Sequence, residues 1–266
     1  MKNKKIATVL RKSALMLLLI ALIIIELCYR LNAEKIGLTA DTYMTLTRLI
    51  GGAACMLFML EFSFETVMNP LGNKSILSIC AILPAFVIAI NNFPFVSYIA
   101  KDCSINGAAG QIALYAFSCL CVGFFEEMAF RGCALMFFLK KRTESKGKIF
   151  IAILLSSLIF GVVHLVNIFT SSPAAVLLQI GYSALIGALC SMVLLYTKNI
   201  WLCVLCHGLY NFCGGLKDNF GEGTMWTSPQ MIFTAIVAVI VTVYMVWLFF
   251  KMPNEKAKEL YLKNNS

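Results

Sequence analysis

The stretch Phe124–Phe138 reads FFEEMAFRGCALMFF and places two adjacent glutamates and an arginine inside an otherwise apolar run. In water, such a run is one edge of a core helix. In a lipid bilayer each charged side chain costs free energy, so the ionisable residues that remain there usually serve a function. The composition of the rest of the chain decides which setting applies.

The composition is typical of a membrane protein. Of 266 residues, 60% are hydrophobic and 13% are charged, whereas soluble domains carry about 25% charged residues; the mean hydropathy is +0.85. We predict an all-α fold with about eight transmembrane helices, in one integral membrane domain over residues 1–266, with the polar site in the interior of the helix bundle. The apolar blocks, each near the ~20 residues that cross a bilayer, are 13–31, 43–62, 75–92, 108–139, 149–169, 174–197, 200–216 and 228–250.

The first block follows a cluster of basic residues and can also be interpreted as a signal peptide. Its apolar core is long for a signal peptide and seven further blocks follow, so an uncleaved helix is favoured.

The basic residues predict the orientation of the chain in the membrane. With eight helices and a cytoplasmic N-terminus, 16 of the 22 basic residues lie inside, 4 outside and 2 within spans. This excess agrees with the positive-inside rule, so we expect both termini in the cytoplasm and the protein in the cell (plasma) membrane. The net charge of +9 then reports topology and contact with membrane lipid. No basic patch has interleaved aromatic residues, which argues against binding to nucleic acid.

Eight polar residues fall within the predicted spans. For Glu26, near the outer end of its helix, and for Arg48, a structural role is favoured, in which the charge reaches toward water or pairs with a neighbouring group. The other six fall into three helical sets, each on one predicted span, and His164 and His207 are the only histidines of the chain. We expect them to meet near the middle of the bilayer, in a water-accessible cavity between helices. The eight are Glu26, Arg48, Glu126, Glu127, Arg131, His164, His207 and Asn211.

Helical spacing groups these residues by face. Glu127 and Arg131 are four apart and can pair, whereas Glu126 is rotated by about 100° and left out of that pair. The segment IFGVVH places Phe160 and His164 on one face, and HGLYN does the same for His207 and Asn211.

These three segments resemble the motifs of the CAAX-protease and bacteriocin-processing family of intramembrane proteases, to which eukaryotic Ras-converting enzyme belongs. EEMAFRG, FGVVH and HGLYN are similar to its E-E-x-x-x-R, F-x-x-x-H and H-x-x-x-N patterns, in the same order on successive hydrophobic helices. The resemblance covers about residues 108–215.

The resemblance implies a role for each matching residue in peptide hydrolysis. Glu126 is the expected general base, and His164 helps to bind and orient the water. His207 and Asn211 are expected to donate hydrogen bonds to the oxyanion, while Glu127 and Arg131 form the buried pair that fixes the site. The implied substrate is a peptide or a lipidated protein.

The sequence leaves open whether the predicted site binds a metal ion. Glu126, His164 and His207 can supply three zinc ligands with an open position for water. A ligand role and an oxyanion role for His207 exclude each other, however, and we favour the version without a cofactor. Cys203–His207 reads CVLCH, which matches the pattern for haem attachment. It begins inside an apolar block rather than on an exposed loop, so haem is disfavoured.

Other functions fit less well. The chain has no H-E-x-x-H segment, no pair of membrane aspartates and no G-x-S-x-G serine, which disfavours the other intramembrane protease classes. The alternative from another class is a non-catalytic membrane protein, either a bacteriocin-immunity factor or a transporter. Buried carboxylates and histidines also serve proton relays in transporters, but the chain lacks the repeated halves that transporters often show.

Overall fold

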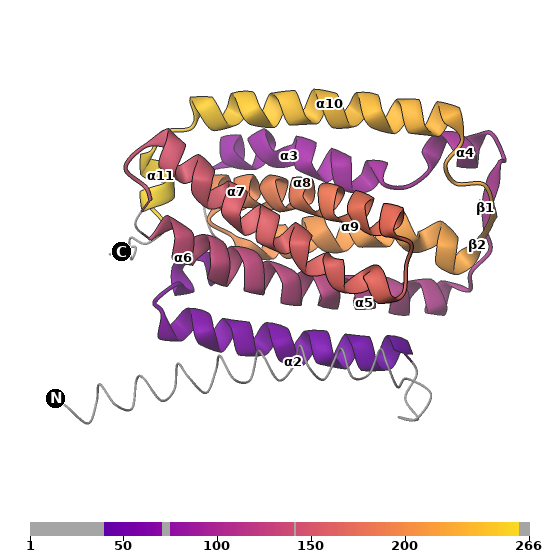
Figure 1. Ribbon diagram of the computed structural model, residues 1–266, viewed down its shortest axis with the longest axis horizontal. Coiled ribbons are helices and arrows are strands. Elements are labelled where there is room, and N and C mark those ends of the chain that lie inside the picture. Colours follow the sequence, from indigo (N-terminus) through magenta and orange to yellow (C-terminus); the bar gives the residue numbers. More distant parts are fainter. Residues whose placement is uncertain (1–39, 71–74, 141, 261–266) are drawn as a thin grey trace.

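Long helices that run roughly along one axis make up the fold (Figure 1). The computed structural model describes residues 40–70, 75–140 and 142–260. Two helices change their winding along their length: α5 continues through a π-helical segment, η3, into α6, and α7 continues into a 3₁₀ segment, η4. The long elements are α2 (Ala40–Glu61), α3 (Ile76–Asn91), α5 (Ala109–Glu127), η3 (Met128–Leu135), α6 (Met136–Leu139), α7 (Lys146–Val163), η4 (His164–Phe169), α8 (Pro173–Thr197), α9 (Ile200–Phe220) and α10 (Ser228–Lys251).

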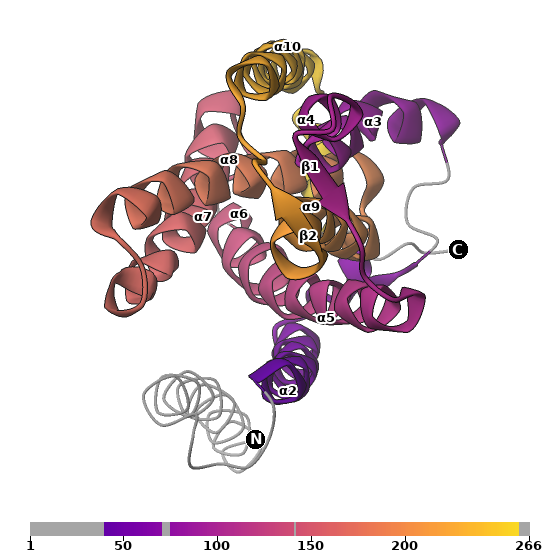
Figure 2. The same ribbon diagram turned by 90° about the vertical axis from the view of Figure 1, so that its right-hand side faces the viewer.

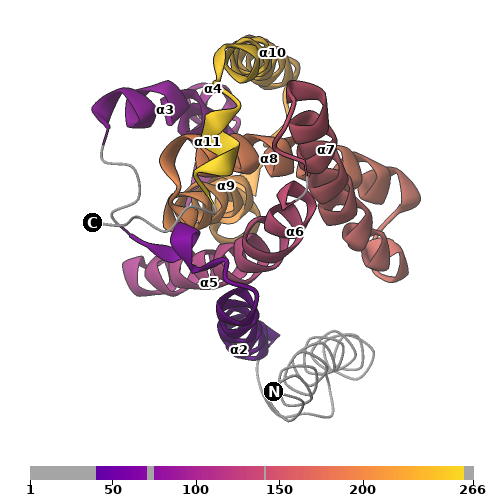
Figure 3. The ribbon, with the colours of Figure 1, turned by 90° about the vertical axis from the view of Figure 1, so that its left-hand side faces the viewer.

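Short elements join the long helices at their ends. β1 and β2 pair antiparallel, with Ser104 opposite Glu222, and this small sheet lies at the right-hand end of Figure 1, beside α4. α11 lies at the opposite end (Figure 3). The short elements are η2 (Glu65–Met68), α4 (Phe95–Ile99), β1 (Cys103–Ile105), β2 (Gly221–Gly223) and α11 (Glu255–Lys258).

The structure supports an all-α polytopic membrane fold, but it does not confirm eight spanning helices. Seven of the eight predicted blocks form helices, while block 13–31 and Glu26 lie outside the described residues. Two helices do not count among the candidate membrane spans. α3 has only 16 residues, and the polar residues of α9 lower its mean hydropathy. Within the described ranges, five helices are long and apolar enough to cross a membrane: Thr42–Glu61, Ala109–Leu139, Lys146–Phe169, Pro173–Thr197 and Ser228–Lys251.

α9 lies at the centre of the bundle, with α3, α5 and α8 around it (Figure 2). Glycine allows α5 and α9 to approach closely: a Cβ atom on Gly123 would lie 2.8 Å from the carbonyl oxygen of Val204. α2 packs on the outer face of α5, and α10 packs on α3. The polar helix of the predicted site is therefore surrounded by apolar ones.

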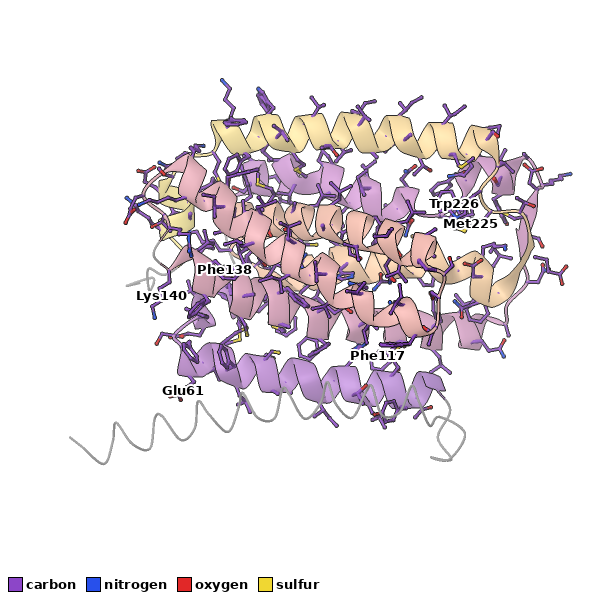
Figure 4. The ribbon with its side chains drawn as sticks, viewed as in Figure 1. Glu61, Phe117, Phe138, Lys140, Met225 and Trp226 are labelled. Atoms are coloured by element: carbon purple, nitrogen blue, oxygen red, sulfur yellow. The ribbon has the colours of Figure 1, made fainter. Side chains whose placement is uncertain are left out.

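The two ends of the bundle differ in charge. We call the end with α6 and α11 the basic end; its described basic residues are Lys140, Arg142, Lys146, Lys148, Lys198, Lys251, Lys256 and Lys258. The sheet end, which carries β1 and β2, has two described basic residues near it, Lys101 and Lys217. Glu61 and Lys140 mark the basic end in Figure 4, and Trp226 marks the sheet end. The loops that the charge pattern predicts to share a side of the membrane thus lie at the same end.

Candidate active site

A buried ion pair anchors the polar site. Arg131 Nη1 donates to Glu127 Oε1 at 2.9 Å, and both side chains are fully buried. Arg131 Nε also donates to the carbonyl oxygen of Gly187 on α8, at 3.3 Å. The pair forms as the spacing of four residues predicts, although it lies where α5 passes into the π-helix. Such π-helical segments occur often at functional sites.

His207 connects this pair to the second glutamate. Its Nδ1 lies 2.7 Å from Glu127 Oε1, and its Nε2 lies 3.4 Å from Glu126 Oε2. A carboxylate only accepts hydrogen bonds, so Nδ1 carries a hydrogen and donates it to Glu127. Nε2 is then an acceptor when the ring is neutral and a donor when the ring is charged. Glu126 is therefore outside the Glu127–Arg131 pair, as predicted, but it faces His207.

His164 is held by its own helix. It is the first residue of η4, and its Nδ1 donates to the carbonyl oxygen of Phe160 at 2.9 Å. This bond leaves Nε2 of the neutral ring as an acceptor. Phe160 is buried, and its ring centroid lies 5.1 Å from that of His164 and 5.5 Å from that of His207. The Arg131 guanidinium lies 4.6 Å from the same ring. One aromatic side chain thus separates the two histidines and covers the arginine.

Two residues that the sequence did not single out hold α9 beside Asn211. The Tyr115 hydroxyl donates to the Asn211 carbonyl oxygen at 3.3 Å, and Asn92 Nδ2 donates to the Tyr210 carbonyl oxygen at 2.9 Å. Asn92 and Tyr115 can lie this close to the α9 backbone because positions 214 and 215 are glycines. Side chains at these two positions would collide with Asn92 and Tyr115. The adjacent glycines inside an apolar helix were the available signal for this close packing.

A cavity of about 1190 Å³ joins the predicted catalytic residues. Glu126, His164, His207 and Asn211 all line it, as does Phe160, whereas Glu127 and Arg131 lie behind its wall. Arg48 also lines the cavity, with its guanidinium 5.2 Å from the centroid of the Phe125 ring. Arg48 thus lies on the cavity wall and packs against an aromatic ring. Asn167, Gln179 and Tyr182 are further polar lining residues that the motifs did not indicate.

Oxygen atoms orient both histidine rings of the site. Both nitrogens of His207 face carboxylates, and His164 Nδ1 is bonded to a backbone carbonyl. Across the described ranges, no three His, Cys, Asp or Glu side chains come together in a group that could hold a metal.

Fold and site define a class: a polytopic helical membrane protein with carboxylates and histidines around an internal cavity. Residues 108–213 match the model of the family described as type II CAAX prenyl endopeptidase Rce1-like. This segment, which contains all seven predicted site residues, is similar to the Rce1-like family of proteases. The resemblance stated from the motifs is confirmed, and the immunity and transporter alternatives are not favoured. Searches of curated proteins and of solved structures found no match.

Proposed function

We propose that this protein is an intramembrane endopeptidase that hydrolyses a peptide bond with a water molecule activated by Glu126. The observation that carries the proposal is that Glu126, His164, His207 and Asn211, from three separate helices, line one cavity. The family description adds the substrate class, a peptide or a prenylated protein at the membrane. We place the protein in the cell membrane with both termini in the cytoplasm, on the charge asymmetry alone.

In this mechanism Glu126 removes a proton from water, and the resulting hydroxide attacks the carbonyl carbon of the substrate. A C–O bond forms and the carbonyl π electrons move to the oxygen. When the tetrahedral intermediate collapses, the C–N bond breaks and Glu126 delivers its proton to the leaving amine. His164 orients the water through Nε2, the nitrogen that its bond to Phe160 leaves as an acceptor. The products are a new carboxyl terminus and a new amino terminus.

The oxyanion is stabilised by the Asn211 side-chain amide and by His207 Nε2–H. His207 donates through Nε2 only when its ring is charged, because Nδ1 already carries a hydrogen. Glu127 accepts the Nδ1–H bond of this ring at 2.7 Å, and Arg131 pairs with Glu127. Arg131, Glu127, His207 and Glu126 then form a row of alternating charge. Such preorganised donors stabilise the charge that develops in the transition state.

The test is the isosteric change Glu126→Gln in purified protein. The parent should cleave members of a panel of quenched fluorescent peptides that includes prenylated C-terminal sequences. Removing a general base costs about 10²–10⁴ in rate, so turnover of the variant should fall by that factor while its thermal unfolding temperature stays unchanged. Glu222→Gln, at an exposed position on β2, is the matched control and should keep full activity. Equal turnover of Glu126→Gln and the parent would refute the proposed mechanism.

A further inference from the structure

The cavity wall carries one arginine. Among the described residues, Arg48 is the only lysine or arginine that lines the cavity, and it faces the same space as the carboxylates of Glu126 and Asp218. Arg48 belongs to α2, so it lies outside residues 108–213, which match the family model. Neither the three motifs nor the proposed mechanism therefore accounts for this side chain.

Phe125 places Arg48 beside the proposed catalytic residues. The guanidinium carbon lies 5.2 Å from the centroid of the Phe125 ring, and Phe125 directly precedes Glu126 in α5. Gly51, one turn further along α2, gives this ring its room, because a Cβ atom there would lie 2.7 Å from the ring. The path from the guanidinium through Phe125 to the Glu126 carboxylate is at most about 18 Å, which an extended peptide covers with about five residues.

Arg48 has the geometry to bind an anion. A guanidinium that lies over a ring contacts it through its face, while its N–H groups lie in the guanidinium plane and can hold both oxygens of a carboxylate. Ser118, two turns before Phe125 on the same face of α5, also lines the cavity. Its hydroxyl accepts a hydrogen bond from Thr45 Oγ1 at 3.1 Å, so its own hydrogen is left to donate. The seam between α2 and α5 thus offers a charged donor and a neutral one.

Depth in the membrane limits which anion reaches Arg48. α2 runs over Ala40–Glu61 and is a candidate membrane span. At 1.5 Å per residue, Arg48 lies about 12 Å from the start of this helix and about 20 Å from its end. Lipid phosphates lie outside the hydrocarbon core, which is about 30 Å thick, and so do not come to this level. A peptide whose end enters the cavity brings its terminal carboxylate with it, and a carboxylate removed from water needs a charged partner.

We propose that Arg48 binds the free C-terminal carboxylate of the substrate, with Ser118 as a second donor, and so fixes how far from that end the peptide bond is cut. The reach from Arg48 to Glu126 limits this distance to about five residues. The proposal rests on the proposed function and names the residue that recognises the end of the substrate. Arg48 takes no part in the bond-breaking steps, so its loss should weaken binding of the substrate and leave turnover of the bound substrate unchanged.

Two peptides that differ only at the C-terminus test the proposal with purified full-length protein. One ends in a free acid and the other in an amide, both have a sequence from the peptide panel above, and mass spectrometry identifies the products. A hydrogen bond to a charged group corresponds to about 10–100-fold in affinity, so kcat/KM of the parent should be higher for the acid by that factor. Arg48→Gln should bring the ratio of acid to amide close to unity, by raising KM for the acid with kcat unchanged.

Two further variants serve as controls. Arg48→Lys keeps the charge but loses the paired N–H groups, so it should retain a smaller preference for the acid. Arg142→Gln removes a guanidinium that lies near Phe138 at the basic end and is not part of the cavity wall, so its ratio should equal that of the parent. Thermal unfolding in detergent shows whether each variant is folded. Because the ratio compares two peptides on the same protein, a partly inactive preparation does not change it.

Equal cleavage of acid and amide by the parent would overturn the proposal, and so would an Arg48→Gln variant that loses the same factor on both peptides. Binding to Glu126→Gln gives a readout that does not depend on turnover. This variant should bind the fluorescently labelled acid more tightly than the amide, whereas Glu126→Gln/Arg48→Gln should bind both alike. If the parent cleaves no peptide of the panel, the proposed function fails, and equal binding of acid and amide to Glu126→Gln would separately refute the role of Arg48.

Discussion

At the scale of single residues, the contacts of Phe160 explain why an aromatic side chain stands one turn before His164. Its ring contacts both histidines and the Arg131 guanidinium, so it fixes three functional groups at once. We expect Phe160→Leu to lower turnover and to destabilise the protein, because the stacked guanidinium contact alone is worth about 1–2 kcal/mol when desolvated. Unfolding and turnover in detergent measure both effects.

Phe137→Leu is the control for this change, since its ring is 58% exposed on the outside of the bundle. It should leave both quantities unchanged. A loss in Phe137→Leu as large as that in Phe160→Leu would contradict the role given to the Phe160 ring.

Arg131 has the largest predicted effect on stability. Arg131→Ala leaves the Glu127 carboxylate buried without its ion-pair partner, which typically costs about 3–5 kcal/mol. Equilibrium unfolding in detergent should show this loss. The double variant Arg131→Ala/Glu127→Gln should recover part of it, because the unpaired charge is removed. A double variant less stable than Arg131→Ala would show that the pair is not the cause.

Sequence reasoning predicted that these residues meet at a cavity but not how they are connected. The face shared by Glu127 and Arg131 follows from helical spacing, and the two lone histidines mark the other helices. The bonds from His207 to both glutamates depend on how α9 docks on α5, which no local pattern encodes. Tyr115 and Asn92 were missed for the same reason, because they act on the α9 backbone from distant parts of the chain.

At the scale of elements, the close packing of α5 on α9 at Gly123 can be tested by substitution. A methyl group there would lie 2.8 Å from the Val204 carbonyl oxygen and 3.0 Å from the Gly208 nitrogen, both backbone atoms with little freedom to move. Overpacking of this kind costs about 1–3 kcal/mol, so Gly123→Ala should unfold at lower temperature.

Gly181→Ala, on α8 with no atom within 4 Å of the added methyl group, is the matched control. It should be neutral or slightly stabilising, because alanine favours helix more than glycine does. Equal destabilisation by the two changes would mean that the α5–α9 contact is looser than described.

Element boundaries were largely predictable and local winding was not. The predicted blocks 174–197 and 228–250 correspond to Pro173–Thr197 and Ser228–Lys251. The π-helix at Met128–Leu135 and the change to 3₁₀ winding at His164 were not predicted, because hydrophobic periodicity over so few residues does not separate these helix types. The strands β1 and β2, with three residues each, are too short to produce an alternating pattern.

At the scale of the whole molecule, a lysine joins two distant parts of the chain at the basic end. Lys146 Nζ donates to the carbonyl oxygens of Phe249 and Phe250, at the C-terminus of α10, at 2.8 and 3.0 Å. A cation stabilises the negative end of a helix dipole, so Lys146→Met should lower the free energy of unfolding by about 1–2 kcal/mol.

Lys148→Met changes a lysine two residues away whose side chain forms an exposed pair with Glu144. Such pairs contribute about 0–1 kcal/mol, so this variant should unfold close to the parent. If both variants unfold alike, the contact between α7 and α10 does not hold this end together.

The buried ion pair also has an electrical consequence. A charge that crosses the full membrane voltage exchanges about 2.3 kcal/mol per 100 mV. Glu127 and Arg131 lie 2.9 Å apart and their charges cancel, so the voltage exerts no net force on the pair and does not draw the anchor of the site toward either side of the membrane.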